Sequence, residues 1–141
     1  MEIALDEYNK TLARMNSVYH EAALKLGLSD SEFDILYMLC SCPDGCYQST
    51  LYKETWKTKS TVNSAIRKME KLNFVYLTRG EGRNTRVFLT DEGKQLVENT
   101  VCKVIKLENI IYHSWTPEQQ QLFLQLNQDF VEKMAAMVNE L

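Results

Sequence analysis

Glycine and proline are scarce in this chain of 141 residues, which contains five glycines and two prolines. Their scarcity excludes a collagen-like chain and leaves little room for flexible linkers. No apolar run approaches the roughly 20 residues of a membrane-spanning helix, so no membrane partner is expected. An excess of positive charge is also missing, because 16 Lys and Arg stand against 19 Asp and Glu, a net charge of −3. Taken over the whole chain, this acidic balance argues against a nucleic-acid partner.

What the chain does contain is typical of one globular domain: 45% apolar and 25% charged residues. Its first residues alternate acidic and isolated apolar side chains, which is neither a signal peptide nor a transit peptide. The expected location is therefore the cytoplasm. There the four cysteines are expected to be thiols, since the cytosol keeps disulfides reduced.

The charge is unevenly distributed along the chain. Residues 51–90 contain nine basic and three acidic side chains, so this segment carries +6 and the remainder −9. A block of this kind within an acidic chain is typical of a surface that binds a polyanion, although a solvated basic surface is the simpler alternative. What the block folds into must decide between the two.

Apolar periodicity predicts helices over most of the chain. One covers residues 1–26 and ends at Gly27, and a second runs from a capping box of Ser29 and Glu32 to about residue 41. A Pro-Asp-Gly turn at 43–45 is followed by a short helix over 49–56, which we expect Leu51 and Trp56 to anchor. The next helix begins after a cap at residue 58 or 60 and reaches residue 72.

After residue 73 the spacing of apolar residues changes from the 3.6-residue period of a helix to the two-residue period of a strand. The runs 74–79 and 86–89 flank a basic segment with two glycines, which predicts a β-hairpin. One helix is expected from residue 90 to about 111. The last helix begins at Thr116-Pro117, where the sequence supplies a cap, a first-turn proline and a capping-box Gln119. The predicted fold class is mainly α with a small β-hairpin wing.

A short helix, a tight turn and an amphipathic helix make a helix-turn-helix, and a basic hairpin directly after it makes the winged form. Small polar side chains on the second helix would let its backbone approach the floor of a major groove, with basic residues further along near the phosphates. The candidate recognition-helix residues are Ser60, Thr61, Asn63, Ser64, Arg67 and Lys68. Further phosphate contacts are predicted for Lys57, Lys59 and Lys71. The candidate wing residues are Arg83, Asn84 and Arg86, which a narrow minor groove would attract.

These segments resemble the multiple-antibiotic-resistance regulators, the MarR family of winged-helix proteins. Residues 69–79 are similar to the family's Leu-Glu-x-x-Gly-Leu-Ile-x-Arg stretch, 81–86 resemble its Asp-x-Arg-Asp-x-Arg wing signature, and 89–93 match Leu-Thr-x-x-Gly. Asn73 replaces the usual glycine at the end of the predicted helix, where a left-handed residue is expected and asparagine is tolerated. Glu81 and Asn84 replace the two wing aspartates. The resemblance implies a homodimer that binds double-stranded DNA at a pseudo-palindromic operator, with repression as the expected mode.

The same resemblance implies a division of the chain's single domain. Residues 28–90 would form the DNA-binding lobe, and residues 1–27 and 91–141 the dimerisation helices. Many relatives respond to small, often aromatic, effectors, and four aromatic residues are candidates to line such a pocket. These are Tyr8, Tyr19, Tyr37 and Trp56, for which ordinary core packing is the alternative.

The only cysteine cluster is Cys40-x-Cys42-x-x-x-Cys46. Inert packed thiols are the first interpretation, and redox sensing by Cys42 and Cys46 on either side of the turn is the second. The spacing is not one that zinc sites commonly use and both histidines lie far away in sequence, so no metal is predicted.

No carboxylate pair, phosphate-binding glycine loop or nucleophile with a paired base is evident, so the chain is expected to be neither an enzyme nor a binder of any cofactor. A sequence-specific transcriptional regulator is the leading hypothesis. The alternatives are a winged helix that docks an acidic protein through its basic face, and a cysteine-based redox sensor.

Overall fold

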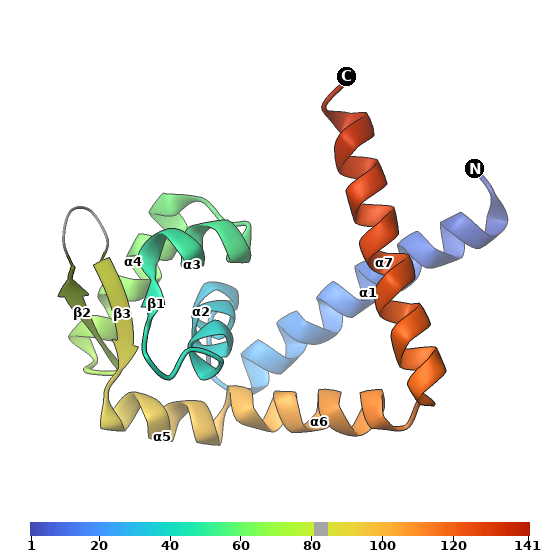
Figure 1. Cartoon of the computed structure of the whole chain (residues 1–141). Coiled ribbons are helices and arrows are strands. Elements are labelled where there is room, and N and C mark those ends of the chain that lie inside the picture. Colours follow the sequence, from blue (N-terminus) through green and yellow to red (C-terminus); the bar gives the residue numbers. More distant parts are fainter. Residues whose placement is uncertain (81–84) are drawn as a thin grey trace. The chain divides into compact units, whose positions relative to one another are not determined.

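The computed structural model describes residues 1–80 and 85–141 of the chain, which divides into two compact units, Met1–Val104 and Ile105–Leu141. The chain order is α1 (Ile3–Lys25), α2 (Asp30–Cys40), β1 (Cys46–Tyr47), α3 (Gln48–Thr55), α4 (Lys59–Lys71), β2 (Val75–Arg79), β3 (Thr85–Leu89), α5 (Asp91–Asn99), α6 (Val101–His113) and α7 (Pro117–Val138) (Figure 1). The predicted fold class, mainly helical with a small β wing, is confirmed.

Local sequence signals set most helix starts. At α2 the Glu32 N–H donates to Ser29 Oγ at 3.1 Å and the Ser29 N–H donates to Glu32 Oε1 at 3.2 Å, which completes the predicted capping box. The capping box at the start of α7 is also present. Of the two caps considered for α4, Thr58 is the one used, since its hydroxyl accepts from the Thr61 N–H at 3.2 Å.

The sheet has three antiparallel strands in the order β1-β3-β2. Cys46 pairs with Val87 on one side of β3, and Leu77 pairs with the same Val87 on the other. The sequence did not predict β1, because two residues are too few to show a period of two. The preceding turn is as predicted: Gly45 has φ +79°, and a Cβ there would lie 2.6 Å from the Phe88 ring.

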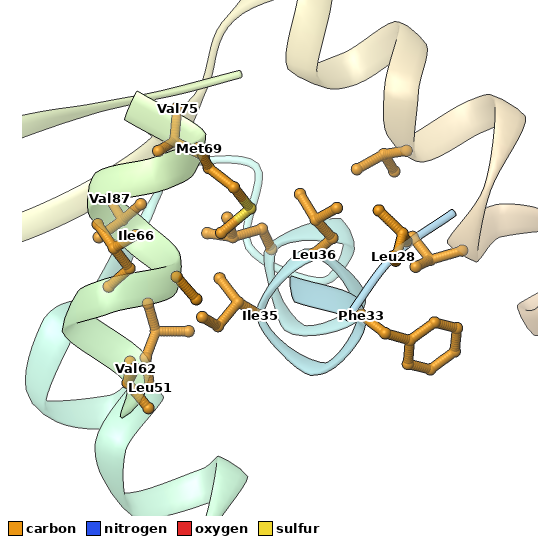
Figure 2. Packing of buried hydrophobic residues seen from close by; sticks show 14 of the residues in the cluster. Leu28, Phe33, Ile35, Leu36, Leu51, Val62, Ile66, Met69, Val75 and Val87 are labelled. Carbon is orange, nitrogen blue, oxygen red and sulfur yellow. The ribbon is translucent and has the colours of Figure 1, made fainter. Parts of the chain in front are cut away.

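The core of the first unit lies between α2 and α4. Figure 2 shows Ile66 and Met69 of α4 facing Ile35 and Leu36 of α2, with Leu51 of α3 beside the start of α4. All five side chains are at most 2% exposed. Burial of these aliphatic groups is the main force that holds α4 at a defined position, at about 25 cal/mol per Å² of apolar surface.

Two predictions about the first unit are wrong. Trp56 does not anchor α3: it ends that helix in the left-handed region at φ 55°, and 87% of the residue is exposed. The helix predicted over 90–111 is two helices, because the chain leaves helical geometry at Thr100, whose hydroxyl donates to the Leu96 carbonyl oxygen at 2.6 Å. No proline or glycine lies next to Thr100 in the sequence, so the break could not be predicted from these residues.

In the second unit, the rest of α6 joins α7 through a packed aromatic turn. The Trp115 ring lies 5.9 Å from that of Tyr112 and 5.0 Å from that of Phe123, between ring centroids. Gln120 Nε2 donates to the carbonyl oxygens of Tyr112 at 2.8 Å and Trp115 at 3.2 Å. These contacts form a packed junction between α6 and α7.

The apolar residues of this unit are largely exposed. Leu107 and Ile111 of α6, for example, are 60% and 57% exposed. Among the residues that the structure describes, none in α7 is buried. Over the described ranges, no helix combines the length and apolar character needed to cross a membrane.

Candidate nucleic-acid interface

Helix α4 separates an apolar face from a polar one. Its buried residues are Val62, Ala65, Ile66 and Met69. The exposed residues include seven of those predicted to contact DNA: Lys59, Ser60, Thr61, Ser64, Arg67, Lys68 and Lys71. Because the apolar face packs within the first unit, these side chains are presented together to solvent at the surface of one rigid helix.

Asn63 is the exception among the predicted recognition residues. It is half-buried, and its Oδ1 accepts hydrogen bonds from Gln48 Nε2 at 2.9 Å and Tyr52 Oη at 2.5 Å. These bonds join α4 to α3 and use the acceptor atom of the amide. A contact from Asn63 to a base edge therefore has to come from its N–H₂ group. Gln48 and Tyr52 were not predicted, since nothing in their spacing indicates a partner 11 to 15 residues away.

Lys68 is oriented by a carboxylate of α2. Its Nζ lies 3.1 Å from Glu32 Oε1, and Glu32 is 7% exposed. Burial by itself raises the pKa of Glu32. The hydrogen bonds from Ser29 and Lys68 lower it by a larger amount, so the pKa lies below its ordinary value. The carboxylate of the capping box thus also links α2 to α4, and Lys68 has a structural partner as well as an exposed position.

The two lysines at the start of α4 have different surroundings. Lys57 Nζ lies 2.7 Å from Asp34 Oδ2, an ion pair between half-buried groups that ties the turn to α2. Lys59 Nζ lies 5.8 Å from the centroid of the Tyr52 ring, within cation–π range. Each lysine thus has a defined partner, and both lie next to the residues Ser49, Tyr52 and Lys53 of α3.

The described part of the wing has one predicted residue, Arg86. Its guanidinium donates to the Asp44 carbonyl oxygen at 3.1 Å and to Tyr47 Oη at 2.8 Å, and lies 4.4 Å from the Tyr47 ring centroid. Arg86 therefore holds β3 against the 43–47 segment. The other two predicted wing residues, Arg83 and Asn84, lie outside the described residues.

The base of the hairpin is held against the end of α4 by the Leu-Thr-x-x-Gly segment. Thr90 Oγ1 donates to the Asn73 carbonyl oxygen at 2.6 Å and accepts from the Gly93 N–H at 2.9 Å. A Cβ on Gly93 would lie 1.9 Å from the Phe74 carbonyl oxygen, so only glycine fits. Asn73 itself has φ 60°, the left-handed conformation predicted for it. This contact fixes the hairpin relative to α4.

All four cysteines are free thiols. Burial and the neighbouring thiol of Cys42 raise the pKa of Cys46 to about 11, with a further contribution from Glu54. Burial and Cys102 raise the pKa of Cys40 to about 12. The structure thus brings Cys42 and Cys46 together, as the redox hypothesis requires, but leaves Cys46 with little thiolate at neutral pH. Within the described residues no group of three or more potential metal ligands is present.

The chain is similar to known proteins in three-dimensional structure but not detectably in sequence. No protein-family model and no curated protein matches the chain. NMB1585, a MarR family regulator from Neisseria meningitidis, is 18% identical over 99% of both chains, with a TM-score of 0.83. A variant of S. aureus MepR bound to an oligodeoxyribonucleotide is 17% identical over 97% of this chain and 99% of its own, with a TM-score of 0.55. PcaV from Streptomyces coelicolor, in complex with its natural ligand, is 16% identical over 86% and 89%, with a TM-score of 0.61.

At these identities the likeness is one of architecture, and it extends over nearly the whole chain. It agrees with the motif resemblance at residues 69–93 and with the contacts that those motifs make at the base of the hairpin. The chain has the fold of the MarR-family transcription regulators.

Proposed function

We propose that this protein is a sequence-specific regulator of transcription that binds double-stranded DNA as a homodimer. The observation that carries the proposal is the exposed face of α4, on which small polar side chains and basic side chains share one surface beside a β-hairpin. Ser60, Thr61 and Ser64 are small enough for the helix backbone to approach a groove floor. Arg67 and Lys71 supply charge that phosphates would attract.

The contacts behind α4 support the same role. Asn63 is bonded to Gln48 and Tyr52 of α3, and Lys68 is paired with Glu32 of α2. A recognition helix must present its side chains in a fixed register, and these bonds add to the apolar packing that holds it. The MepR variant, which has the same fold, is bound to an oligodeoxyribonucleotide.

The homodimer is supported by apolar surface on helices outside the lobe. In α7 the exposed large apolar residues are Leu122, Phe123, Leu124, Leu126, Phe130, Val131, Met134, Met137 and Val138. In α1, Ala23 alone is buried. Many exposed apolar residues on one helix are typical of a protein interface. A homodimer on a pseudo-palindrome would place its two α4 helices about one DNA turn (~34 Å) apart.

Repression with release by a small ligand is the mode of regulation that we favour. PcaV, with the same fold, is in complex with its natural ligand. In this chain the Phe33 ring contacts those of Tyr19 and Tyr37, with ring centroids 6.3 and 6.0 Å from its own, and this aromatic cluster is where we expect an aromatic effector to bind. Thiol oxidation is less favoured, because the pKa of Cys46 is raised to about 11.

Selection of bound sequences from random duplex DNA tests the proposal. The expected result is a pseudo-palindrome with half-sites about 10 base pairs apart. Arg67→Ala should then weaken binding to that site and flatten its salt dependence, while Lys94→Ala on α5 serves as the matched loss of one positive charge. Failure to enrich any sequence, or equal effects of the two variants, would contradict the proposal.

A further inference from the structure

An open groove beside the start of α4 has three lysines among its five lining residues. It has a volume of about 500 Å³, and its lining residues are Ser49, Tyr52, Lys53, Lys57 and Lys59. None of the five is acidic. Lys57 is paired with Asp34 outside the lining, whereas Lys53 is exposed on α3. The groove is therefore a concave surface of positive charge, with hydroxyls on Ser49 and Tyr52.

The turn between α3 and α4, next to this groove in the chain, contains an exposed tryptophan. Trp56 lies in the chain between Lys53 and Lys57, has φ 55°, and is 87% exposed. A bulky side chain in the left-handed region is strained, and a large exposed aromatic group gains nothing from the core. Strained residues of this kind cluster at functional sites. In contrast, the other two left-handed positions in the helix ends, Gly27 and Asn73, are occupied by residues that tolerate the conformation.

We infer that this groove binds one backbone phosphate of duplex DNA outside the bases that α4 reads, and that Trp56 packs against the adjoining deoxyribose. The inference rests on the proposed DNA binding and extends it to residues 49–56. Lys53 and Lys59 supply the charge, the Ser49 hydroxyl supplies a neutral donor, and the tryptophan supplies apolar area and an N–H group. Lys59 both lines the groove and is the first residue of α4, so the groove adjoins the helix proposed to read the bases. This position favours DNA over an acidic protein as the ligand of the groove.

The fluorescence of Trp56 gives a direct test. The chain has two tryptophans, so Trp115→Phe leaves Trp56 as the only one. Addition of a duplex with the selected site should shift its emission to the blue and reduce acrylamide quenching at least about twofold, because the indole leaves water. Unchanged quenching in the saturated complex would overturn the inference, as would protection by a poly-glutamate peptide but not by DNA.

The phosphate contact is tested separately. Lys53→Ala should weaken binding roughly three- to tenfold and reduce the salt slope by about one, and Lys94→Ala should change neither. Single methylphosphonate substitutions flanking the site should include one that weakens binding by the original protein but not by Lys53→Ala. If the original protein binds its site and Lys53→Ala behaves identically, the inference fails and the proposed function stands. If no duplex is bound, both fail.

Discussion

Helices α4 and α7 use apolar residues in opposite ways. The 13 residues of α4 include four that are buried by the rest of the first unit, whereas none of the 22 residues of α7 is buried among those described. The apolar face of α4 is thus satisfied within one chain and its polar face is left to solvent. In α7, by contrast, the apolar residues themselves are left exposed to solvent. On the proposed function, this difference distinguishes the helix that would read DNA from the helix that would join two copies of the chain.

The comparison has a thermodynamic consequence. Interactions within the first unit contribute to stability independently of protein concentration. If α7 is covered by a second copy of the chain, the stability of that part depends on concentration by mass action. Variants in the two regions should therefore differ in kind as well as in size.

The largest expected effect is on the first unit, from Gly93→Ala. The added Cβ would lie 1.9 Å from the backbone oxygen of Phe74, which no side-chain rotation can relieve. We expect a loss of about 3 kcal/mol in the free energy of unfolding, the same at every protein concentration. Urea denaturation at two concentrations measures it.

Gly27→Ala is the matched control for Gly93. Gly27 has φ +72° but no atom within 4 Å of a built Cβ, so its replacement costs only backbone strain, about 1 kcal/mol. Equal losses for the two variants would show that backbone conformation, rather than the Phe74 contact, decides the effect.

A charge in the middle of α7 should act on association. Leu126 is 58% exposed, and Leu126→Glu would bury a carboxylate in the proposed interface. We expect dimerisation to weaken about 100-fold, or roughly 2.7 kcal/mol, with the first unit still folded. Sedimentation with circular dichroism tests this, and Gln125→Glu is the control. Equal behaviour of the two variants would remove the contrast between α4 and α7.

The ion pair of Glu32 and Lys68 predicts a pH dependence. A carboxylate whose pKa is lowered on folding stabilises the fold above its unfolded pKa of about 4.3, and this contribution is lost as the pH falls through the folded pKa. Glu32→Gln should cost about 1 kcal/mol at pH 7, limited because Lys68 is partly exposed, and less below pH 4. Glu70→Gln, on the exposed side of α4, is the control; a pH-independent loss would contradict the assignment.

The smallest effect expected is a gain. Trp56→Gly should relieve the left-handed strain and stabilise the first unit by up to about 1 kcal/mol, while it weakens DNA binding. Parallel measurement of thermal unfolding and DNA affinity checks both. A loss of stability would mean that Trp56 contributes to packing.

The sequence predicted the parts of the fold that depend on neighbours in the chain. The Ser29 and Glu32 capping box, the Gly45 turn and left-handed Asn73 are all local signals, and all are confirmed. The break at Thr100 and the exposed position of Trp56 were missed. Apolar character shows that a residue can be buried, but tertiary geometry decides whether a partner lies opposite it.

The same division holds at the candidate interface. By itself the sequence determined the winged order of elements, the +6 charge of residues 51–90 and the basic and small residues of α4, because composition and period are local properties. Only the tertiary structure decided that Asn63 is bonded to Gln48 and Tyr52, and that Lys68 reaches Glu32, 36 residues away. Such pairs form because burial of the apolar faces of α2 and α4 brings distant polar groups together, and no spacing along the chain encodes them.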